Sequence, residues 1–331
     1  MLPTNKPLRN YRKLGSLLLI VALTILSVVY KQFIIDVVHY VTFKPSPAIT
    51  SIAQKITLTD KGKFYFYASR PELSGRSTFN TKCVRKEANS PILGCYSTQQ
   101  IFVFDVTNEK LDGIEQVTSA HELLHAVYER MPQSEKDALA PHLQRDYARL
   151  ADKELIDRMK YYSKNEPGEQ NNELFSILGT EFNEVSELLQ QEYAKYFSNR
   201  SAIVAYHTAS HAVFTSLSSR ANSIASQLTS LINKINATTK QYNEAAAVVA
   251  SKVASFNQKA TTKGQFTSQA QFNEARSNLL AEVAALNAQR ASIKLDIDRY
   301  KKLRADLEAI ALESDALNRS IDSQLAPASK L

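Results

Sequence analysis

The residues of this chain best suited to chemistry form the segment His121-Glu122-Leu123-Leu124-His125. On a helix, residues four positions apart lie on one face, so the two imidazoles can bind one metal ion. The carboxylate of Glu122 can then reach a water molecule at that ion, accept its proton and pass it to a leaving amine. The spacing therefore predicts a Zn²⁺ site, with His121 and His125 as ligands and Glu122 as the general base.

The surroundings of this motif favour the same interpretation. The flanking residues Ser119, Ala120, Ala126 and Val127 are uncharged, as a buried active-site helix requires. The alternative is a solvated helix that carries two histidines by accident, but a chance HExxH is expected in only about one such sequence in a hundred.

The elements that must position the motif can also be predicted. A helix should begin near Leu111 or Ile114 and end near Met131, because Pro132 follows. Before it, Gln100–Val106 is rich in aromatic and β-branched residues and is predicted as a strand. In a peptidase, its Ile101–Val106 portion would be an edge strand beside the cleft, available to pair with an extended substrate.

The motif resembles that of the zincin metallopeptidases, and a later segment is similar to one of their subgroups, the gluzincins. Asn172-Glu173-Leu174-Phe175-Ser176 resembles the Asn-Glu-x-x-Ser element of thermolysin-like enzymes. The resemblance implies that Glu173 is the third zinc ligand and that the small Ser176 lets two helices approach closely. The sequence departs from that family at Ile177, where the family has Asp, and in a longer separation from His125.

Glu181 is the alternative third ligand. It lies nearer than Glu173 to the apolar stripe of the same predicted helix, and whichever carboxylate does not bind metal could hydrogen-bond a ligand histidine. The segment ELFSILGTE, downstream of HExxH and behind one N-terminal span, also resembles a group of uncharacterised bacterial membrane-anchored proteins. That resemblance covers roughly residues 1–215 and implies no substrate.

His207 and His211 are a second pair with helical spacing, but Thr208 occupies the position of a catalytic Glu. His207, or the neighbouring Tyr206, could donate a hydrogen bond to an oxyanion in the cleft as a transition-state stabiliser. The alternative is ordinary packing on a helix surface.

The N-terminal segment is typical of a membrane anchor. Four basic residues between Lys6 and Lys13 precede an uncharged run at residues 14–30, which as a helix covers roughly 25 Å. Lys31 can snorkel, and apolar residues between Phe33 and Val41 extend an apolar face into the interface. The basic flank predicts a single-pass protein with a cytoplasmic N-terminus and an extracytoplasmic catalytic domain. A cleaved signal peptide is the alternative.

Cysteine usage agrees with export. Cys83 and Cys95 are the only two cysteines and lie close enough in sequence to close a short loop by a disulfide in an oxidising compartment. Two unpaired buried thiols are the alternative. The net charge of +7 is spread along the chain among acidic residues, so we expect no nucleic-acid partner. No glycine-rich phosphate loop is present. The expected substrate, a protein or peptide, follows from the peptidase motif at His121–His125.

The rest of the chain is predicted to be largely helical. Lys44–Ala53 should be a tether and Lys63–Ala68 a strand, followed after the motif by helices at Ser134–Leu150, Asp152–Tyr162 and about Gln170–Phe197. From Phe214, apolar residues recur at steps of three and four in two segments separated by Thr261–Gly264, which predicts an antiparallel helical hairpin or coiled coil.

The expected fold class is therefore mainly α with a small β element, an α+β zincin-like domain. We expect an anchor at residues 1–43, a metallopeptidase domain at 44–212 and a hairpin at 213–331. The hairpin could bind a coiled-coil partner or a second copy. This leaves a second functional hypothesis, a cell-envelope scaffold or adaptor with a structural or vestigial zinc site.

Overall fold

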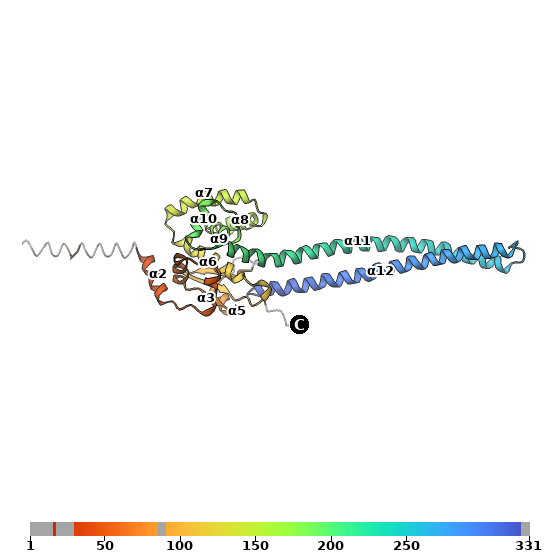
Figure 1. Ribbon diagram of the computed structural model, residues 1–331, viewed down its shortest axis with the longest axis horizontal. Coiled ribbons are helices and arrows are strands. Elements are labelled where there is room, and N and C mark those ends of the chain that lie inside the picture. The colour runs from red at the N-terminus through yellow and green to blue at the C-terminus, as the bar shows by residue number, and fades with distance from the viewer. Residues whose placement is uncertain (1–15, 18–29, 85–90, 326–331) are drawn as a thin grey trace, which may run out of the picture. The chain divides into compact units, whose positions relative to one another are not determined.

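The computed structural model describes residues 16–17, 30–84 and 91–325 (Figure 1). The chain forms two compact units. The first comprises residues up to Val213 together with those from Leu317 onward, and the second runs from Phe214 to Ala316. As predicted, the structure is mainly helical with one small sheet.

The first unit holds most of the secondary structure. In chain order its elements are α2 (Lys31–Thr42), α3 (Pro47–Lys55), α4 (Asp60–Ala68), β1 (Glu72–Ser74), α5 (Arg76–Lys82), β2 (Gly94–Ser97), β3 (Gln100–Phe104), η1 (Glu109–Leu111), α6 (Ile114–Arg130), α7 (Gln133–Leu150), α8 (Lys153–Asn165), α9 (Gln170–Glu181) and α10 (Glu187–Ala194). The long helices α11 (Arg200–Thr261) and α12 (Gln269–Ile321) begin and end in this unit, respectively.

The sheet has the strand order β1-β3-β2, with β1 parallel and β2 antiparallel to β3. The predicted strand at Gln100–Val106 is thus confirmed as β3, but β3 is the central strand and β2 is an edge. Helix α6 contacts β2 and β3 of the sheet and also helix α9. The core between α6 and α9 contains the fully buried Leu123, Leu124, Phe175 and Leu178.

Two predictions for the segment before the sheet are wrong. Lys63–Ala68 is not a strand but the end of α4, because Thr59 caps the helix by accepting a hydrogen bond from the Gly62 N–H and Phe66 is buried in the core. Lys44–Ala53 is not a tether, because α3 begins there with Ser46 as its N-cap and buries Ile49 and Ile52.

The helices after the motif match the prediction except in one place. The motif helix is α6, and α7 and α8 lie where helices were expected. The single helix predicted at about Gln170–Phe197 is instead two, α9 and α10. Long-range contacts cause the break: Arg200 donates to the carbonyl of Phe182 at the end of α9, and the Asp146 carboxylate accepts from the Ser186 N–H before α10.

The predicted membrane span at residues 14–30 lies almost entirely outside the described residues. Of that run only Ser16, Leu17 and Tyr30 are described. Among the residues that the structure covers, no helix is both long and apolar enough to cross a bilayer. Residues 31–42, which the sequence analysis grouped with the anchor, form α2 and pack on α4.

The second unit is the predicted helical hairpin. Its helices, α11 from Phe214 and α12 up to Ala316, pack side by side (Figure 1). Ion pairs between Lys234 and Asp296 and between Lys252 and Glu282 join them. The heptad positions Leu231, Ile235, Val249 and Ile310 are buried, and a cluster of Phe256, Phe266 and Phe272 lies beside the turn.

Candidate metal centre

Helix α6 brings the two motif histidines together. The helical period places His121 and His125 one turn apart on the same face, and their Nε2 atoms are 3.0 Å from each other. Both side chains are largely buried. Two imidazole nitrogens at this separation can bind the same ion.

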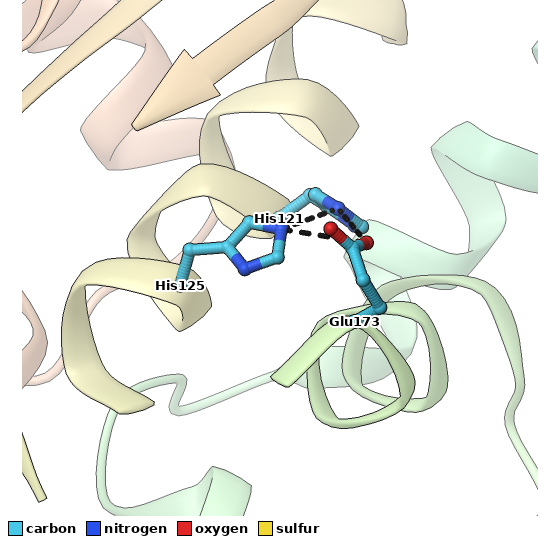
Figure 2. Close-up of side chains that lie close together, drawn as sticks. All are labelled: His121, His125 and Glu173. Atoms are coloured by element: carbon cyan, nitrogen blue, oxygen red, sulfur yellow. Dashed lines mark hydrogen bonds and ion pairs between the residues drawn. The ribbon is translucent and has the colours of Figure 1, made fainter. Parts of the chain in front are cut away.

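The third member of the cluster is Glu173 of α9 (Figure 2). Its Oε2 lies 3.8 Å from His121 Nε2 and 3.7 Å from His125 Nε2. Neighbouring ligand atoms of a tetrahedral zinc site stand roughly 3.3 Å apart, given metal–ligand bonds of about 2 Å. The three donors, two imidazole nitrogens and one carboxylate oxygen, therefore fit zinc in type and nearly in spacing.

Close packing of α9 on α6 makes this approach possible. Ser176 is fully buried, in agreement with the prediction that a small residue is needed there. Gly179, one turn further along, is packed more tightly, because a Cβ atom at this position would overlap Leu124 of α6. This role of Gly179 was not predicted from the sequence.

Glu173 Oε2 provides a direct test of whether a metal fits. This oxygen is buried and has no hydrogen-bond partner among the residues that the structure describes. A buried carboxylate oxygen without a partner is costly. Because the same atom is aimed at both imidazoles, a cation bound between them would remove that cost.

Asn172 orients one of the ligands. The Nδ1–H of His125 donates to Asn172 Oδ1 at 2.9 Å, and Asn172 Nδ2 donates to Glu169. With the proton of the neutral imidazole on Nδ1, the Nε2 lone pair of His125 can bind the metal. Asn172 belongs to the segment that resembles gluzincins, but its function was not predicted.

The electrostatics of the two histidines differ. Burial, together with the nearby His125 and Arg158, holds the pKa of His121 well below its usual value. Burial also opposes protonation of His125, but the carboxylates of Glu173 and Glu122 outweigh it and raise the pKa of His125. Protonation therefore competes with metal binding more strongly at His125 than at His121.

The side chain of Glu122, a residue of α6, packs against the edge strand β2. Only 6% of the residue is exposed. Burial raises its pKa to about 7, with Glu173 adding to the shift, while His125 and the backbone N–H of Tyr96 oppose it. Gly94 of β2 packs against the carboxylate, since a Cβ there would stand 2.6 Å from Glu122 Oε1. A carboxylate with such a pKa can both accept and return a proton.

A cleft of about 670 Å³ opens onto these residues. Its lining includes residues of β2, α6 and α9, and Tyr162 of α8. Ile101–Val106 was predicted as the edge strand beside this cleft, but β3 is the central strand and β2 is the edge strand that lines the cleft. Phe104 N–H donates to Leu93 O, so by the antiparallel alternation the peptide groups of Gly94 and Tyr96 point away from β3.

Glu181, the alternative ligand, is engaged elsewhere. Its carboxylate accepts two hydrogen bonds from Arg158, at 2.7 and 3.0 Å, and lies 3.5 Å from His207 Nε2. It does not belong to the cluster of possible metal ligands. The geometry favours Glu173 over Glu181. Nothing in the sequence pattern pointed to Arg158 as the partner of Glu181.

The two predicted transition-state stabilisers lie apart from the cleft lining. His207 contacts Glu181, and burial lowers its pKa. Tyr206 packs against Gly113, where a Cβ would stand 2.5 Å from the tyrosine ring. Neither residue lines the cleft, whereas Tyr162 does. Burial raises the pKa of Glu173, and Tyr162 is among the groups that oppose this rise.

The disulfide borders the cleft through Cys95. Cys83 and Cys95 are bonded, as predicted, and tie the end of α5 to β2. The site thus consists of a His-His-Glu group that could hold a metal, an acid beside it and a partly buried edge strand. Compared with known protein families, curated proteins and solved structures, the chain shows no significant match.

Proposed function

We propose that this protein is a zinc-dependent endopeptidase of the zincin type, anchored in a membrane by its N-terminal segment. One observation carries the proposal: the buried, unpartnered Oε2 of Glu173 is aimed at the converging Nε2 atoms of His121 and His125. Glu122, the residue that the motif chemistry requires, is directly beside them.

Each residue has a defined task in peptide-bond hydrolysis. His121, His125 and Glu173 would hold zinc, which when bound supplies a Lewis acid for a carbonyl group and makes water more acidic. Glu122 takes one proton from the attacking water and delivers it to the leaving amine as the C–N bond breaks. Asn172 keeps the His125 ring in the orientation that its ligand role needs.

The edge of β2 is suited to hold the substrate. The peptide groups of Gly94 and Tyr96 point away from β3, and the Tyr96 N–H bonds Glu122. An extended polypeptide added as a further strand would therefore pair with the Gly94 peptide group and the Tyr96 carbonyl. A chain bound this way would run past Glu122, because Gly94 packs directly on that side chain. This arrangement supports an endopeptidase acting on unfolded or extended segments.

The location of the enzyme follows from two features. The uncharged run at residues 14–30, preceded by basic residues, supports a single span with a cytoplasmic N-terminus. The Cys83–Cys95 disulfide supports an oxidising compartment for the first unit. We therefore place the cleft outside the cytoplasm.

The test is zinc content and casein cleavage, measured on the full chain in detergent. One zinc per chain and cleavage are expected for the wild type. His125→Ala should lose zinc and activity, whereas Glu122→Gln should keep zinc and lose activity. Glu187→Gln, on the adjacent α10, is the matched control and should behave as the wild type. A wild type that binds no zinc would overturn the proposal.

The second candidate function is a cell-envelope scaffold. The hairpin exposes Val248, Leu280 and Leu295, apolar side chains that a partner or a second copy could cover. The zinc site would then be structural. If Glu122→Gln leaves the cellular phenotype intact and removal of residues 214–316 abolishes it, the scaffold function is favoured.

A further inference from the structure

Helix α2 has its polar side turned toward the first unit. Gln32, Asp36 and His39 lie on this side, and each is hydrogen-bonded within the unit. Gln32 accepts from Gln99, and His39 Nδ1 lies 3.1 Å from a backbone carbonyl oxygen that it can reach as a donor. Surface helices of water-soluble domains normally show the opposite arrangement, with the apolar side inward.

The opposite side of α2 is apolar and exposed. Its central stripe consists of Tyr30, immediately before the helix, with Ile34, Val38 and Val41, spaced by four, four and three residues. We call these four residues the outer face of α2. Between 49% and 69% of each residue is exposed. An exposed apolar surface of this kind marks a contact with something other than water.

The chain itself indicates what covers this face. The uncharged run at residues 14–30 leads directly into α2, so a membrane-spanning run would place the start of α2 at the bilayer surface. Tyr30 has the amphipathic ring typical of the membrane interface, and Lys31 can snorkel to the headgroups. The one acid of the helix, Asp36, is buried against Arg130 and would not meet lipid.

We propose that the outer face of α2 lies in the membrane interface and seats the first unit on the bilayer. The proposal rests on the membrane anchoring proposed above. It requires a lipid surface, not a second protein, as the partner of this face. Apolar helix faces held at the headgroup boundary are an established mode of interfacial binding.

Side-chain contacts connect helix α2 to the cleft. Arg130, the last residue of α6, forms a buried ion pair with Asp36 and donates a hydrogen bond to the Tyr96 hydroxyl of β2. Two side-chain contacts therefore lead from α2 to the strand that lines the cleft. A membrane seat at α2 would set the orientation of the cleft relative to the bilayer.

The experiment uses the full chain in vesicles of phosphatidylcholine and phosphatidylglycerol. A fluorophore is attached at Val38→Cys or, as a matched control, at Val248→Cys. The two valines lie in helices and are 51% and 54% exposed. The native cysteines are bonded to each other and do not compete for the label. Nitroxide-labelled lipids should quench the Val38 probe several-fold more than the Val248 probe, and aqueous iodide should show the reverse.

Three results would overturn the proposal. Quenching of Val38 by iodide but not by lipid nitroxides means that the face is open to water, and protection from both quenchers means that protein covers it. In either case, flotation with the vesicles shows that the anchor itself holds. A chain that does not float with the vesicles has no membrane anchor, and this result also contradicts the membrane contact proposed for α2. Zinc content and casein cleavage of the same preparation test the peptidase function separately. Val41→Cys repeats the measurement at a second position.

Discussion

Gly94 of β2 and Glu122 of α6 are in such close contact that a single added methyl group would collide with the carboxylate. The Cβ of an alanine at residue 94 would stand 2.6 Å from Glu122 Oε1 and 2.8 Å from its Cγ. The glycine is thus required for space, because it lets the strand edge and the acid lie side by side. The position of the proposed general base depends on this contact.

Gly94→Ala should therefore impair catalysis without removing zinc. Displacing Glu122 by about 1 Å can cost on the order of 100-fold in rate, and we expect a kcat for casein peptides lowered by that order, with unchanged zinc content. Gly75→Ala is the control, because nothing lies within 4 Å of a Cβ at that residue. Full activity of Gly94→Ala would show that Glu122 does not need this position.

Asn172→Ala should weaken zinc binding. Loss of the hydrogen bond that orients a ligand histidine typically costs about 10- to 100-fold in metal affinity, and we expect a loss in this range by competition with a chelator. Asn171→Ala changes the neighbouring asparagine, which bonds Gln144 instead of His125. Equal affinities of the two variants would contradict the proposed role of Asn172.

Zinc affinity should fall as the pH is lowered. Binding requires deprotonated His125 and Glu173, and the pKa values of both groups are raised in the metal-free site. Protons therefore compete more strongly as the pH decreases, and the loss should begin at a higher pH than the ordinary pKa values of a histidine and a glutamate would give. Because the Glu122 carboxylate raises the pKa of His125, Glu122→Gln should retain affinity to lower pH. An affinity independent of pH would exclude this competition.

Asp36→Asn should destabilise the first unit. The Asp36 and Arg130 side chains are only 3% and 5% exposed, so the substitution leaves a buried charge without its partner. Such a loss costs about 3–5 kcal/mol in the free energy of unfolding. Asp112→Asn breaks a surface pair with Lys55, in which the Asp112 side chain is 73% exposed, and should leave the unfolding curve in detergent nearly unchanged. Similar curves for the two variants would refute the expected difference.

Local patterns were sufficient for part of this site. The i and i+4 spacing of His121 and His125 places them together on any helix, and Pro132 ends that helix. The hairpin was equally predictable, because its heptad pattern repeats over many turns. A short sequence separation also sufficed for the Cys83–Cys95 bond.

Other features depended on contacts between distant residues. Lys63–Ala68 has strand-like composition, but the cap at Thr59 and burial of Phe66 make it helical. The break between α9 and α10 depends on Arg200, which lies beyond both helices. No local pattern could show these contacts.

The choice between Glu173 and Glu181 shows the same division most clearly. Sequence alone determined that an HExxH helix needs a further carboxylate and that both acids lie on a later helix. Only the tertiary structure decided between them. Helix α9 packs on α6 with Glu173 toward the histidines, whereas Glu181 forms an ion pair with Arg158 of α8. A helix face is set by local periodicity, but what that face meets is set by packing of the whole unit.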